Sequence, residues 1–159
     1  MAPPDIVPCL WLDEHAEAAA SLYLEAFADA RAEAVARYPE SGANPAKRPP
    51  GSVLTVDVRL AGQAITLLNG GPSFRPNPSL SFHVILGDEA DVDALHAVLA
   101  EGGAELMPLD AYPWSSRYAW IEDRFGVSWQ LMTRPDTPEP RIVPCLMFAG
   151  EHHGWAREA

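Results

Sequence analysis

The sequence predicts an α+β fold built from two similar halves. Residues 6–70 follow the order strand, helix, strand, strand, and residues 80–133 repeat that order with little shared sequence. One such unit leaves one face of its sheet uncovered, so we expect the two units to lie side by side. Together they would form a curved mixed sheet with helices on its outer face and a cavity on its inner face.

The first half begins with an apolar segment and an amphipathic helix. Residues 6–12 (IVPCLWL) are rich in strand formers and predict a buried strand. Asp13 can cap the helix that follows. Over residues 15–30, apolar side chains recur at helical spacing on one face and glutamates line the other, so we expect a helix there.

A loop and a hairpin complete the first half. Residues 37–52 are dense in proline and glycine, which predicts a loop. Residues 53–60 alternate in the manner of a half-buried strand. A short turn leads to a second strand at residues 64–69, and the two strands are expected to form a hairpin.

The second half repeats this organisation. Residues 80–86 predict a strand, and residues 87–103 contain a helix that Asp88 caps and that Gly102 and Gly103 end. The remaining strands are expected at residues 105–109, 117–122 and 127–133, the last two joined by a tight turn.

Charge and cysteine usage exclude several classes of partner. The formal net charge is −11, which repels phosphate backbones and anionic lipid headgroups, so we expect no nucleic acid and no membrane as partner. No apolar run approaches the roughly 20 residues that cross a bilayer, and the first residues do not resemble a secretion signal. The two cysteines, Cys9 and Cys145, have no metal-binding spacing, and we expect reduced thiols in a cytoplasmic protein.

Four segments carry a resemblance to a known family. They are "IVPCLWL" with "AAASLYLEAF" within residues 6–27, "LLNGGPSF" at residues 67–74, "ALHAVLAEGG" at residues 94–103 and "DRFGVSWQL" at residues 123–131. In this order they resemble the vicinal oxygen chelate (glyoxalase and bleomycin-resistance) superfamily, and more narrowly its PhnB-like branch, also called 3-demethylubiquinone 3-methyltransferase-like. The resemblance implies paired βαβββ modules around a cavity and a homodimer.

The pentapeptide "IVPCL" occurs at residues 6–10 and again at residues 142–146. Some members of the PhnB-like branch carry two domains in tandem, and the second copy resembles the opening strand of such a domain. We therefore expect one domain over residues 1–135, followed at 136–159 by a linker and the start of an incomplete second copy. A lone strand at residues 142–148 has little stability, so we expect it to pair with a sheet of its own subunit or, by strand swapping, of a neighbour.

The resemblance also permits a test for a metal site. Metal-dependent members of the superfamily hold one divalent ion with His, Gln and Glu side chains from four strands. The corresponding positions here are Pro8, Ser81 and Gln130, with Leu68 and Asn69 at the end of the first half. This set contains no carboxylate and no imidazole, so we expect no metal and no cofactor.

The predicted cavity is lined by five residues: Asn69, Ser81, His83, Trp120 and Gln130. Strand alternation places His83 on the face of Ser81, where it is the candidate catalytic residue; the alternative is a hydrogen-bonded histidine in the cavity wall. The aromatic cluster of residues 111–125, which includes Trp120, fits cavity walls and hairpin packing equally well.

Three functions fit this pattern. The first is metal-independent binding of a small organic molecule, for sequestration or sensing. The second is a superfamily-type lyase, isomerase or dioxygenase that uses His83 as a base or a metal brought in with a partner's ligands. The third is an interaction module with a vestigial cavity. Methyl transfer is not supported, because "NGGPSF" at residues 69–74 precedes prolines and a strand rather than a cofactor-binding helix.

Overall fold

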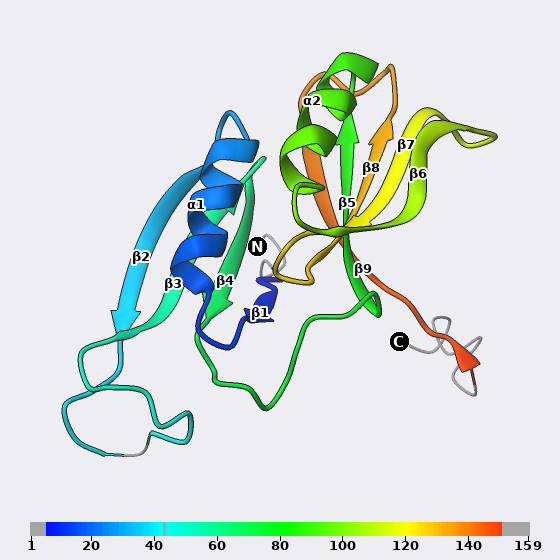
Figure 1. Cartoon of the computed structure of the whole chain (residues 1–159). Coiled ribbons are helices and arrows are strands. Elements are labelled where there is room, and N and C mark those ends of the chain that lie inside the picture. Colours follow the sequence, from blue (N-terminus) through cyan, green and yellow to red (C-terminus); the bar gives the residue numbers. More distant parts are fainter. Residues whose placement is uncertain (1–5, 43, 151–159) are drawn as a thin grey trace.

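The computed structural model describes residues 6–42 and 44–150, which form two modules (Figure 1). The first module contains β1 (Cys9–Trp11), α1 (Ala16–Ala26), β2 (Arg31–Arg37), β3 (Val53–Leu60) and β4 (Gln63–Leu68). The second contains β5 (Leu80–Leu86), α2 (Glu89–Leu99), β6 (Ala104–Tyr112), β7 (Ser115–Glu122) and β8 (Ser128–Thr133). A last strand, β9 (Arg141–Leu146), follows the second module.

The two modules have the same topology. The strand orders are β1-β4-β3-β2 in one sheet and β6-β7-β8-β5-β9 in the other. In each module the first strand runs parallel to the last and the other pairs are antiparallel. The α+β class with paired βαβββ modules is confirmed. Their strands form two mixed sheets, and the described residues close no barrel.

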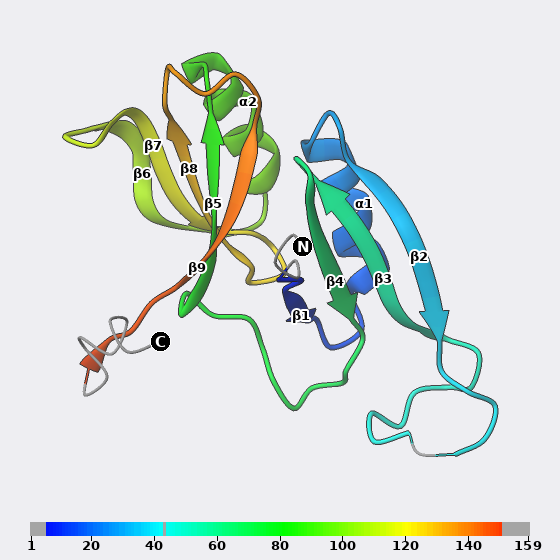
Figure 2. The same cartoon turned by 180° about the vertical axis from the view of Figure 1, so that it is seen from behind.

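Both helices lie on the same side of the sheets, and the view from behind shows the sheet faces that carry no helix (Figure 2). We call these the inner faces. The helical side is held together by one apolar core to which both modules contribute. At its centre is the fully buried Trp129 of β8, whose ring lies 5.2 Å from that of Tyr23 and 5.7 Å from that of Phe27. Tyr23 lies on α1, and Phe27 is the first residue after this helix. The Trp129 indole therefore joins the two modules.

The first module differs from expectation at both ends of its helix. The N-cap of α1 is His15 rather than Asp13. The helix ends at Ala26, with Phe27 already extended, and Arg31–Arg37 form β2, which the sequence did not predict. The helix prediction was therefore wrong over residues 27–30. All seven residues of β2 are exposed, so no burial pattern marks the strand, and its alanines, arginines and glutamate favour a helix locally. Pairing with β3 decides its conformation.

The second copy of the pentapeptide lies in β9, at the edge of the second sheet. This strand pairs antiparallel with β5 of the same chain, and the side chain of Ile142 enters the core with 6% exposure. The first copy pairs differently, because β1 runs parallel to β4. Residues 151–159 lie outside the described part, so a second domain copy and strand swapping stay predictions. Within the described residues, neither helix is long and apolar enough to span a membrane.

Candidate functional site

A row of polar and aromatic side chains lies on the inner face of the second sheet. Strand register pairs Ser81 with Ser128, and Gln130 with both His83 and Trp120, so these side chains share one face. The alternate residues of the same strands, among them Trp129 and Leu131, lie on the helical side and are buried. We call this row, with Tyr118, the polar strip: Ser81, His83, Tyr118, Trp120, Ser128 and Gln130.

Hydrogen bonds fix most of the polar strip. Gln130 Nε2 donates to Ser81 Oγ at 2.8 Å, and Tyr118 Oη donates to Gln130 Oε1 at 2.7 Å. Trp120 Nε1 donates to Ser128 Oγ at 2.8 Å. Burial, aided by neighbouring Tyr112, raises the pKa of Tyr118 to about 12, so the phenol remains a donor at neutral pH. These contacts hold the strip in one arrangement before any ligand arrives.

His83 is the exception within the polar strip. Its side chain is half-buried and lies between Gln130 of β8 and Val143 of β9 in the strand register. The imidazole makes no hydrogen bond or ion pair with any residue that the structure describes. Both ring nitrogens are therefore available to an incoming molecule.

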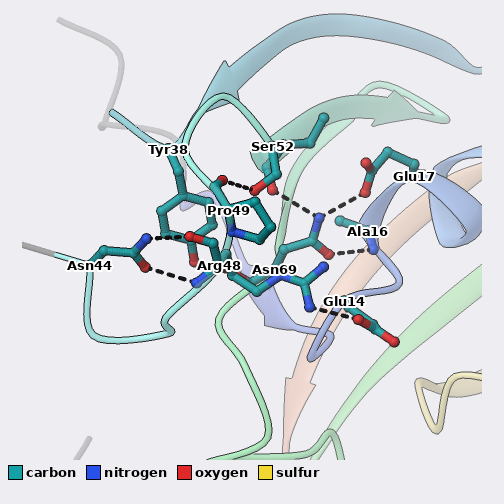
Figure 3. A network of polar contacts seen from close by, with 10 residues as sticks. Glu14, Ala16, Glu17, Tyr38, Asn44, Arg48, Pro49, Ser52 and Asn69 are labelled. Atoms are coloured by element: carbon teal, nitrogen blue, oxygen red, sulfur yellow. Dashed lines mark hydrogen bonds and ion pairs between the residues drawn. The ribbon is translucent and has the colours of Figure 1, made fainter. Parts of the chain in front are cut away.

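Asn69 lies apart from the polar strip, directly after β4. It is 2% exposed, and its amide is used within the protein. Asn69 Oδ1 accepts a hydrogen bond from the backbone N–H of Ala16 at 2.8 Å, while Nδ2 donates to Glu17 Oε2 at 2.7 Å and to the carbonyl of Val53 (Figure 3). Asn69 thus caps the start of α1. A contact between Asn69 and a ligand stays a prediction.

The loop predicted at residues 37–52, of which Arg37 belongs to β2, is tied to the same place. Arg48 Nη1 lies 2.6 Å from Glu14 Oε2, and the hydroxyl of Tyr38 donates to the carbonyl of Asn69 (Figure 3). Asn44 Nδ2 donates to the carbonyl of Arg48 at 2.6 Å. The loop is therefore anchored beside the start of α1 rather than beside the polar strip.

Tyr118 belongs to the site but was not among the predicted site residues. Tyr118 is two residues before Trp120 on β7, and strand alternation alone places both on one face. The other aromatic residues of the β6–β7 hairpin, Tyr112 and Trp114, stack on each other with centroids 5.1 Å apart and contact the Tyr118 ring. Part of the aromatic cluster therefore packs within the hairpin, while Trp120 belongs to the strip.

A cleft between the modules begins at the end of the polar strip. One cavity of about 190 Å³ reaches Ser128 and Leu80 on one side and Cys9 and Trp11 of β1 on the other. A neighbouring cavity of about 320 Å³ shares Trp11 and extends toward Phe125. The cleft thus reaches Ser128 of the polar strip from the space between the two modules.

The side chains at the family's metal positions do not form a metal site. Pro8 has no donor atom, Ser81 Oγ accepts from Gln130, and Gln130 Oε1 accepts from Tyr118. In the part of the chain that the structure describes, no group of three His, Cys, Asp or Glu residues could hold a metal ion. The donor set does not fit the divalent cation of the metal-dependent superfamily members.

Two βαβββ modules with helices on one side and a polar inner face define a protein of the vicinal oxygen chelate, or glyoxalase, fold. The family described as 3-demethylubiquinone-9 3-methyltransferase matches residues 4–132, and the chain belongs to that family. The predicted resemblance to the superfamily and its PhnB-like branch is confirmed.

Solved structures agree with this assignment. The PhnB protein from Bacillus cereus is 32% identical, with a TM-score of 0.72 over 82% of this chain and 100% of that chain. A protein from Pseudomonas aeruginosa is 23% identical, with a TM-score of 0.70 over 83% and 98%. A glyoxalase-related enzyme from Fulvimarina pelagi is 19% identical, with a TM-score of 0.54 over 90% and 98%. The last two show the fold alone. None of the curated proteins matches the chain.

Proposed function

We propose that this protein binds a small organic molecule on the polar strip without a metal ion. The observation that carries the proposal is the state of His83. Its imidazole is half-buried and has no hydrogen-bond partner among the described residues, whereas the neighbouring polar side chains of the strip have their hydrogen bonds satisfied. Trp120, on the far side of Gln130 from His83 in the strand register, offers an aromatic surface for an apolar or planar group. A small molecule with a polar group near His83 and an apolar body over Trp120 fits this arrangement.

We further propose that a second copy of the chain closes the site. On its own, the second sheet leaves the apolar side chain of Val143 on β9 40% exposed on its inner face. The edge strand β2 of the first sheet is also exposed along its whole length. A homodimer that covers the inner faces would bury these surfaces and enclose the polar strip. The free Cys9 and Cys145 favour a reducing compartment such as the cytoplasm.

The same imidazole supports a second candidate function. A histidine whose nitrogens have no described protein partner can accept a proton from a bound molecule, which is the role a lyase or isomerase requires. Methyl transfer is not proposed, because residues 70–79 form an irregular connection that leads into β5 rather than into a helix. The loop therefore offers no helix N-terminus to a methyl donor.

A thermal-shift screen of metabolites with the wild-type protein and two histidine variants tests the proposal. A ligand should raise the melting temperature by mass action, and His83→Ala should weaken its binding about tenfold or more, corresponding to about 1.4 kcal/mol. His96→Ala, on α2 and away from the polar strip, is the matched control and should bind as the wild type does. The screen is run with and without a chelator.

The outcomes separate the candidate functions. Equal binding by His83→Ala and the wild type would contradict a role for the strip. Binding that disappears with chelator would favour a metal-dependent enzyme. Conversion of the ligand by the wild type but not by His83→Ala would assign catalysis to that imidazole. No ligand across a broad screen would favour an interaction module.

A further inference from the structure

A larger cavity lies at the opposite end of β5 from Ser81. Its volume is about 790 Å³, within the range of roughly 300–1,000 Å³ that small-molecule pockets occupy. The walls come from residues 25–29 at the end of α1, the turn between β3 and β4, Leu86 at the end of β5, one side of α2, and the residues before β9. We call it the interhelical cavity. None of its lining residues belongs to the polar strip.

The floor of the interhelical cavity is apolar. It is formed by the buried side chains of Phe27, Leu86 and Leu95, which are 5–6% exposed, and by the partly buried Val98. No lysine, arginine, histidine, hydroxyl or amide side chain is among the described lining residues. Such a floor favours a hydrocarbon or aromatic body, and the lining offers nothing that recognises an anion.

The charged groups on this cavity are all carboxylates. Glu25, Asp29, Asp91 and Glu139 line it from four different segments. Asp29 is held in place, because its Oδ1 accepts a hydrogen bond from the backbone N–H of Ala61 at 3.0 Å. Glu25, Asp91 and Glu139 form no ion pair with any residue that the structure describes. The net charge of −11 adds a long-range attraction for cations.

We propose that the interhelical cavity is a second binding site, for an organic cation that joins an ammonium or amidinium group to an alkyl or aryl body. The apolar floor receives the body and the carboxylates receive the charge. A bare metal ion fits poorly, since no three acidic side chains of the described chain gather closely enough to hold one. A neutral apolar molecule would leave the carboxylates without a counter-ion.

Three molecules that differ in charge on one scaffold test the proposal directly. Binding of 4-phenylbutylamine, 4-phenylbutanol and 4-phenylbutyrate to the full chain is measured by isothermal titration calorimetry at pH 7. The ammonium form of the amine should bind, the alcohol should bind about tenfold more weakly, and the acid should not bind measurably. Raising the salt concentration should weaken binding of the amine more than binding of the alcohol. Equal affinity for amine and alcohol would overturn the charge assignment.

Two tryptophan substitutions on α2 locate the site. Ala94→Trp fills the cavity from its wall and should abolish amine binding. Ala97→Trp, on an alanine of α2 that is also exposed but does not line the cavity, should leave binding unchanged. Circular dichroism establishes that both variants fold. Unchanged amine binding by Ala94→Trp would refute the location.

His83→Ala tests whether the interhelical cavity is independent of the polar strip. It should not change amine affinity, so failure of this proposal and failure of the proposed strip function are distinguishable. If none of the three molecules binds the wild type and only a basic protein segment does, the small-molecule site is refuted in favour of a protein interface.

Discussion

At the scale of single residues, Asp123 accepts four hydrogen bonds, and the one from Tyr23 connects the two modules. Its Oδ2 accepts from the hydroxyl of Tyr23 on α1 at 2.8 Å and from the indole of Trp129 at 3.0 Å. Its Oδ1 accepts from the backbone N–H groups of Phe125 and Val127. The carboxylate thus shapes the turn before β8 and fixes Trp129 at the centre of the shared core.

The protonation of Asp123 makes stability depend on pH. Burial raises its pKa, and the hydrogen bonds from Trp129, Tyr23 and the backbone oppose that rise only in part. Because the folded pKa lies above the unfolded one, the folded state binds this proton more tightly. The contribution of Asp123 to stability therefore falls as pH rises from the ordinary aspartate pKa of about 3.9 through the raised folded value.

Asp123→Asn tests this role. In the wild type, four donors share the two carboxylate oxygens of Asp123. In the variant, the amide offers one oxygen and its NH₂ group must face donors, so the free energy of unfolding should fall by about 1–3 kcal/mol at pH 7. The difference in the free energy of unfolding between the variant and the wild type should grow as pH is lowered from the raised folded pKa of Asp123 toward its unfolded value. Only the wild type is stabilised by protonation of Asp123. Urea unfolding at several pH values measures both effects.

Asp110→Asn is the control for this experiment, since Asp110 is exposed and bonds only to the adjacent Ala111 backbone. It should change stability by about 0.5 kcal/mol or less. A pH-independent difference between Asp123→Asn and the wild type would argue against the raised pKa.

At the scale of elements, β9 is attached to the edge of the second sheet mainly through its backbone. It pairs with β5 along six residues, and only one of its side chains, that of Ile142, is buried in the core. The rest of the strand lies on the inner face or at the surface. The backbone ladder and one isoleucine therefore hold the strand in place.

Ile142→Ala should lower the free energy of unfolding by about 2–4 kcal/mol, because it leaves a cavity in the shared core. Leu146→Ala, at the 65% exposed end of the same strand, should change it by less than about 1 kcal/mol. Urea unfolding measures the two variants. Equal small effects would show that β9 is not docked on β5 in solution.

At the scale of the whole molecule, the two inner faces remain open while the helical side is closed by one core. This asymmetry is the physical basis of the proposed homodimer. Burial of apolar inner-face side chains contributes roughly 25 cal/mol for each Å² removed from water. The mass in solution is therefore expected to be twice the 17.3 kDa of one chain.

Val143→Lys places a charge on the inner face and should shift sedimentation equilibrium toward the monomer. Leu24→Lys is its control, because Leu24 lies on α1 with a similar exposure of 38% against 40% for Val143. The control should retain the wild-type mass. A wild-type protein that stays monomeric at all concentrations, or a Val143→Lys variant that stays dimeric, would contradict the proposed closure of the inner faces.

Local patterns in the sequence were enough for most elements and for most of the site's composition. Alternation along residues 80–86 and 127–133 placed Ser81, His83 and Gln130 on one face, and the structure has them there. Strand β2 and the role of Asn69 could not be predicted in this way. The first depends on pairing with β3, and the second on the approach of β4 to the start of α1.

By itself, the sequence determined the two-module α+β organisation and the family, because periodicity and short motifs are local properties of the chain. Only the tertiary structure decided which polar groups are already satisfied and which are free. In the folded chain, the amide of Asn69 hydrogen-bonds to the start of α1, and the imidazole of His83 has no described partner. The interhelical cavity is formed by segments far apart in the chain. The physical reason is that hydrogen-bond satisfaction and cavity formation depend on contacts between distant residues, which no local pattern encodes.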